Sequence, residues 1–76
     1  MEIKILGSGC AKCKKLEANV MKALKSVGKT AVIDHEKDIN EIIKYNIMAT
    51  PGLVIDGKVV STGQVLSPKA IEAFLN

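Results

Sequence analysis

The 76-residue sequence contains eleven lysines but no arginine, and Tyr45 and Phe74 are its only aromatic residues. Nucleic-acid binding commonly uses arginine forks, aromatic stacking platforms and a clustered basic surface. The lysines are instead spread along the chain, so the net charge of +3 indicates solvated helix faces. We therefore expect no nucleic-acid partner.

Long apolar runs are also missing, and none approaches the length that a membrane crossing needs. Met1 leads directly into a strand pattern, without the pattern of a signal peptide. Charged residues make up only 25% of the chain, which excludes a disordered tail, and 76 residues leave room for one core. We expect a single domain over residues 1–76 that is cytoplasmic, monomeric and not attached to a membrane.

The chain has two cysteines, and both lie in Cys10-Ala11-Lys12-Cys13, between an apolar strand and an amphipathic helix. Side chains three residues apart at the start of a helix lie on one face, close enough to form a disulfide. The helix amides favour a thiolate at Cys10, and a thiolate attacks disulfides or binds soft metals. In the cytosol such a pair is more often catalytic or metal-binding than structural.

Four apolar segments are predicted to form β-strands, at residues 2–6, 30–34, 53–55 and 58–60. A long amphipathic segment separates the first two strands, which should therefore be parallel neighbours. Asp56-Gly57 between the last two predicts a type I′ hairpin. The order βαβαββα predicts an α/β fold with a mixed four-stranded sheet and helices on both faces.

Three segments have the apolar spacing of helices, and each carries end signals. The first begins at the cysteines and stops at Gly28, and Ser67-Pro68 should begin the last. Asp38 and Glu41 have the spacing of a capping box, and Asn46 should end that second helix in a left-handed conformation. The residues expected to face the core are Cys13, Leu16, Val20, Ala23, Leu24 and Val27, then Ile39, Ile42 and Ile43, then Ile71, Phe74 and Leu75.

The segment Met48-Ala49-Thr50-Pro51-Gly52 is the second notable feature. Proline cannot donate a hydrogen bond to a sheet, so Pro51 belongs at the first residue of a strand. A cis bond there would turn the Thr50 backbone outward to pair with an extended peptide, whereas a trans proline would only start the strand. Met48 either shields a disulfide from solvent or belongs to the core.

In combination, the Gly7-Ser8-Gly9-Cys10 entry, the paired cysteines, Thr50-Pro51 and the strand order resemble the thioredoxin/glutaredoxin superfamily. The chain is similar over essentially its whole length to the small thioredoxin-like proteins of archaea and bacteria called redox-active disulfide protein 2. It departs from thioredoxin itself at Gly9, where thioredoxin has a tryptophan. The first strand also lacks thioredoxin's buried aspartate.

The resemblance implies a role for each matching residue. Cys10 would be the attacking thiolate and Cys13 the resolving thiol. Pro51 would be a cis-proline packed against the disulfide, Thr50 a backbone contact for the partner, and Gly63 the glycine that closes the same groove. Outside this set, Lys12 either steers an acidic partner and modulates the thiolate or is a solvated helix residue.

Three alternative functions would use the same two cysteines. The first is a thiol–disulfide oxidoreductase that reduces protein or small-molecule disulfides, with no bound cofactor or metal, and is re-reduced by an electron donor similar to thioredoxin reductase. The second is a soft-metal, Cu(I)-type binding module, although such domains usually have methionine at the position of Ser8. The third is a redox-sensing interaction domain. His35 is expected in an exposed loop rather than as a general base or metal ligand.

Overall fold

The computed structural model describes residues 1–7, 11–47 and 49–75. Its elements in chain order are β1 (Glu2–Leu6), α1 (Ala11–Val27), β2 (Val32–Glu36), α2 (Ile39–Ile43), β3 (Gly52–Ile55), β4 (Lys58–Thr62) and α3 (Pro68–Leu75). The strands form a four-stranded sheet in the order β2-β1-β3-β4. β1 is parallel to β2 and antiparallel to β3, and β3 is antiparallel to β4. The predicted α/β fold with a mixed sheet is confirmed.

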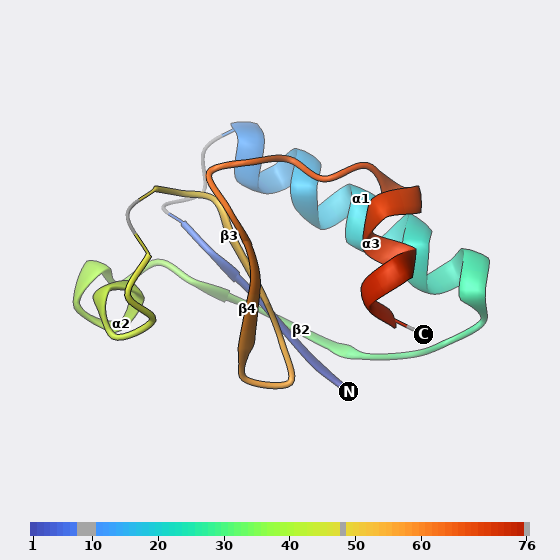
Figure 1. The fold of residues 1–76 in the computed structure, drawn as a ribbon, viewed down its shortest axis with the longest axis horizontal. Helices are drawn as coiled ribbons and strands as arrows, with labels where there is room; N and C mark the ends of the chain where they lie inside the picture. The colour runs from blue at the N-terminus through green and yellow to red at the C-terminus, as the bar shows by residue number, and fades with distance from the viewer. Residues whose placement is uncertain (8–10, 48, 76) are drawn as a thin grey trace.

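The helices are divided unequally between the two faces of the sheet. Figure 1 shows α1 and α3 side by side on one side of the strands, with α2 apart from them. The main core joins Ile3 and Ile5 of β1 to the buried stripes of α1 and α3. On the opposite face, Ile42 of α2 packs with Leu6 and Val54 in a smaller cluster. Helices therefore lie on both faces, as predicted, but the second face has one short helix.

The position of β2 differs from the prediction, because the strand covers residues 32–36 instead of 30–34. Its parallel register with β1 pairs Glu2 with Val32 and Leu6 with Glu36. The register is thus fixed by the length of β1, and residues before Val32 are needed for the return from α1. β2 lies at the edge of the sheet, where exposed and polar side chains are tolerated.

The end signals of the helices are confirmed with one exception. Gly28 has φ +69 and the Lys29 amide donates to the Leu24 carbonyl, which closes α1. The Asp38 carboxylate accepts from the Asn40 amide, but Glu36 rather than Glu41 accepts from the amide of Asp38. The expected capping box is therefore wrong, because Glu41 instead bonds Lys44, one turn further along the chain.

The predicted end of α2, the predicted start of α3 and the predicted hairpin turn are confirmed. Asn46 has φ 58 after α2, and the Ser67 hydroxyl accepts from the Ala70 amide at the start of α3. Asp56 and Gly57 have φ 49 and 81, the two positive values that a type I′ turn requires. The Asp56 carboxylate also accepts from the Glu2 amide at 2.8 Å, which ties the hairpin to the start of β1.

Three apolar residues that were expected to face the core are exposed instead. Ile39 and Ile43 are 61% and 60% exposed, and Phe74 is 47% exposed. In α2, Ile42 alone reaches the sheet, because one turn of helix has only a narrow buried side. In α3, Ile71 and Leu75 form the buried line, which leaves Phe74 on the flank.

Candidate active site

Cys13 lies in the first turns of α1, with its side chain inside the protein. It begins the apolar stripe that α1 presents to the sheet and is 1% exposed. Cys10 and Met48, two of the predicted site residues, lie outside the described residues. The described part of the site consists of Cys13 and the segments around it.

The sulfur of Cys13 rests on the backbone of Gly7, immediately after β1. Gly7 is buried, and its amide donates to the Glu36 carbonyl of β2 at 2.9 Å. A Cβ atom added to Gly7 would overlap Cys13 Sγ and would lie 3.8 Å from the Cβ of Thr50. The end of β1, the start of α1 and the loop before β3 thus meet at this point.

The loop before β3 contains a cis peptide bond between Thr50 and Pro51, which confirms the predicted isomer. Pro51 is fully buried, whereas Thr50 is exposed beside the cysteine. The next residue, Gly52, is packed tightly, because an added Cβ would lie 3.0 Å from Ile47 Cδ1 and 3.2 Å from Leu6 Cδ1. Pro51 and Gly52 therefore anchor the loop in the protein interior, while Thr50 faces outward.

Gly63 supports this loop from the end of β4. Its amide donates to the Pro51 carbonyl at 2.8 Å, and its φ of +68 is in the left-handed region. A Cβ added to Gly63 would lie 3.1 Å from the Cβ of Ala49. The structure thus brings together Cys13, Thr50, Pro51 and Gly63, four of the residues selected from the sequence.

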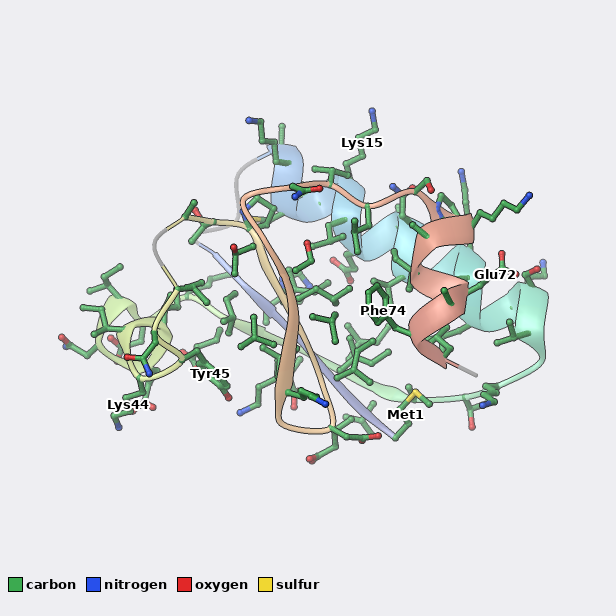
Figure 2. All side chains as sticks on the ribbon, viewed as in Figure 1. Met1, Lys15, Lys44, Tyr45, Glu72 and Phe74 are labelled. Carbon is green, nitrogen blue, oxygen red and sulfur yellow. The ribbon has the colours of Figure 1, made fainter. Side chains whose placement is uncertain are left out.

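The start of α1 is basic. Lys12, Lys14 and Lys15 are exposed there, and the first turn of α1 contains no acidic residue. Figure 2 shows the Lys15 side chain extending away from α1. The surface at the start of α1, on either side of Cys13, therefore carries positive charge.

His35 lies within β2 rather than in a loop, so the expectation for its position is wrong. Its Nε2 atom is 2.7 Å from Glu17 Oε2, and the pair joins β2 to α1. Across residues 1–7, 11–47 and 49–75, no group of three or more histidine, cysteine, aspartate or glutamate side chains is placed to hold a metal ion. None of the helices in these ranges combines the length and the apolar character that a membrane crossing requires.

One residue of this site was missed by the sequence analysis. Gly7 appears there only as part of a glycine-rich entry, and its contact with Cys13 is not predicted. The available signal is its place: it follows a buried strand directly and precedes the cysteine pair by a few residues. A glycine at such a position allows another group to approach the backbone closely.

Comparison with known proteins adds to this geometry. A family model described as thioredoxin domain matches residues 1–76. A protein named thioredoxin from Methanothermobacter thermautotrophicus is 37% identical over 76 residues, which cover all of this chain and 99% of the relative. Another protein of that name, from Methanocaldococcus jannaschii, is 37% identical over 73 residues, or 96% of this chain and 84% of the relative. These similarities do not favour the soft-metal or redox-sensing alternatives.

Proposed function

The chain belongs to the thioredoxin domain family and is a small thiol–disulfide oxidoreductase, and we propose that Cys10 and Cys13 are the two thiols that carry its electrons. The observation that carries this assignment is the position of Cys13, which is buried against Gly7 and beside the cis Thr50–Pro51 loop. Cys10 precedes Cys13 by three residues, a spacing that suits an intramolecular disulfide.

The proposed reaction has two steps. The Cys10 thiolate attacks one sulfur of the substrate disulfide, forms a mixed disulfide and releases the other substrate sulfur as a thiolate. Cys13, as a thiolate, then attacks Cys10 Sγ, and the second substrate sulfur leaves with the electron pair of the broken bond. The substrate disulfide gains two electrons in total, and the domain is left with a Cys10–Cys13 disulfide.

The exposed side of the loop before β3 supports a role in binding substrate. Thr50 is exposed next to the Cys13 region, while Pro51 and Gly52 are buried and hold the loop in place. An extended segment of a substrate protein would pair with the Thr50 backbone, which brings its disulfide to the cysteines. The hydrogen bond from Gly63 keeps this loop in position. We further propose that Met48 shields the disulfide and that Lys12 contributes to charge steering of acidic partners.

The reaction also defines the partners. The substrate is a disulfide in a protein or a small molecule, and an electron donor of the thioredoxin-reductase type returns the Cys10–Cys13 disulfide to the dithiol. Since the electrons reside in the sulfur atoms, the cycle needs no bound cofactor. We place the protein in the cytoplasm, where such a reductase keeps dithiols reduced, and we expect a monomer.

The first experiment compares Cys10→Ser and Cys13→Ser in the reduction of a protein disulfide such as insulin. Cys13→Ser should accumulate a covalent mixed disulfide, visible as an added mass, because only the resolving step is lost. Cys10→Ser should form none. In the unaltered protein, thiol trapping should give a reversible two-electron transition between about −180 and −300 mV. A protein that forms no reversible intramolecular disulfide would contradict the proposal.

A further inference from the structure

The backbone conformation at position 7 does not require glycine. Gly28, Gly57 and Gly63 have φ values between +68 and +81, where side chains are strained, but Gly7 lies outside that region. Its amide follows the sheet and donates to the Glu36 carbonyl at 2.9 Å. The reason for glycine at this position is therefore space.

The space is occupied by the sulfur of Cys13. An alanine methyl group at Gly7 would overlap Cys13 Sγ, so the sulfur could not keep its present position beside a side chain at residue 7. We propose that Gly7 is a positioning residue for the second step of the dithiol reaction. By having no side chain, it lets the Cys13 sulfur rest on the backbone at the end of β1, in the position from which it attacks Cys10. This inference rests on the proposed function of Cys10 and Cys13.

The second step is sensitive to such a position. Cys13 Sγ forms a bond to Cys10 Sγ while the bond from Cys10 to the substrate breaks, so three sulfur atoms must be aligned. A displacement of about 1 Å in a reacting group can lower a rate about 100-fold. The first step requires only Cys10 and the substrate, and Cys13 forms no bond in it. A side chain at position 7 should therefore slow the second step and leave the rate of the first step nearly unchanged.

The disulfide form should suffer more than the dithiol form in Gly7→Ala. A reduced Cys13 side chain can rotate away from the added methyl group, but a disulfide fixes the sulfur within narrow limits of distance and torsion. The intramolecular disulfide should become about tenfold less stable relative to the dithiol. For a two-electron couple this change corresponds to a reduction potential about 30 mV less negative.

The test uses the full chain and the disulfide 5,5′-dithiobis(2-nitrobenzoate), which releases one coloured thiolate in each step. In Gly7→Ala, the first release should remain within about twofold of the unaltered protein, and the second should slow at least tenfold. Gly28→Ala is the matched control, because it strains a glycine with φ +69 that has no atom within 4 Å of an added Cβ. It should lower stability but leave both releases unchanged.

The outcomes separate the two proposals. If the unaltered protein gives no second release, the Cys10–Cys13 assignment fails. If it gives both releases and Gly7→Ala gives them at unaltered rates, or slows both equally, the role of Gly7 is wrong while the assignment stands. If Gly7→Ala is too unstable for kinetics, Cys13→Ala decides, since removing the sulfur should restore stability to the double variant. Equal loss of stability with and without the sulfur would also overturn the inference.

Discussion

Gly63 donates its backbone amide to the carbonyl of Pro51 at 2.8 Å, so the end of β4 directly supports the loop that carries the cis peptide bond. The contact is close on its other side as well, because an added Cβ would lie 3.1 Å from Ala49. Gly63 therefore combines a left-handed backbone, a hydrogen bond and a tight contact.

Gly63→Ala should lower the free energy of unfolding by about 1–2 kcal/mol, because alanine is strained at positive φ. It should also reduce turnover with a protein disulfide, since the methyl group pushes on Ala49 and moves the loop. Gly57→Ala is the control: its φ is +81 but nothing lies within 4 Å of an added Cβ. Urea unfolding and insulin reduction check both variants. Equal loss of turnover in the two would contradict a specific role for Gly63.

Ile71→Ala and Phe74→Ala should differ strongly in stability, although both residues are apolar and lie on α3. Ile71 is fully buried, whereas Phe74 is 47% exposed. Removing the buried side chain leaves a cavity and should cost about 2–5 kcal/mol, while the flanking ring should contribute about 1 kcal/mol or less. Denaturant midpoints at constant slope measure the difference. A larger loss for Phe74→Ala would show that the ring is buried in solution.

The pair formed by His35 and Glu17 should stabilise the fold modestly. Both side chains are partly exposed, 28% and 35%, at a separation of 2.7 Å between Nε2 and Oε2. A double-mutant cycle with His35→Gln and Glu17→Gln should give a coupling of about 0.5 kcal/mol that shrinks in 1 M salt. Insulin reduction should remain unchanged in both variants. A large loss of turnover in His35→Gln would instead indicate that His35 transfers protons in the reaction.

The interaction between Lys4 and Tyr45 predicts that the folded protein loses stability at high pH. Hydrogen bonding to the Tyr45 hydroxyl raises the pKa of Lys4 above 10.5, with a further contribution from the charge of Tyr45. Figure 2 shows Tyr45 between α2 and the strands. The folded state then binds more protons than the unfolded state, so this contribution is complete below pH 10.5 and falls as the pH rises through the pKa of the folded state. Unfolding of Tyr45→Phe between pH 9 and 12 should lack this decline, and an identical profile would contradict the contact.

Much of the fold follows from local signals in the sequence. The Asp56-Gly57 turn requires two positive φ values that few other dipeptides adopt, and Ser67-Pro68 specifies a helix start by capping and by the fixed φ of proline. The stripe of α1 is long enough for its buried side to be unambiguous. These signals are local, so they need no knowledge of the partner segments.

The predictions from sequence are wrong where the limits or the burial of a segment depend on the segment that it packs against. β2 takes its limits from β1, and the exposed strand residue Val32 has no local signal that marks the shift. Ile39 and Ile43 have the spacing of a core face, but a one-turn helix buries only the side that meets the sheet. The contact between Gly7 and Cys13 joins a strand end to a helix, and it depends on atomic positions that a sequence pattern does not contain.

The sheet order has a consequence for how the chain matures during its synthesis. β1 leaves the ribosome well before β3, yet β3 is one of its two neighbours in the sheet, with Ile3 paired to Ile55. Until residues 52–55 have left the exit tunnel, the edge of β1 that pairs with β3 has no partner. The apolar side chains of β1 are then incompletely covered. Such distant pairing slows folding. Cys13 is therefore translated well before the loop that lies beside it in the folded protein, and its thiol is open to other thiols and oxidants during that interval.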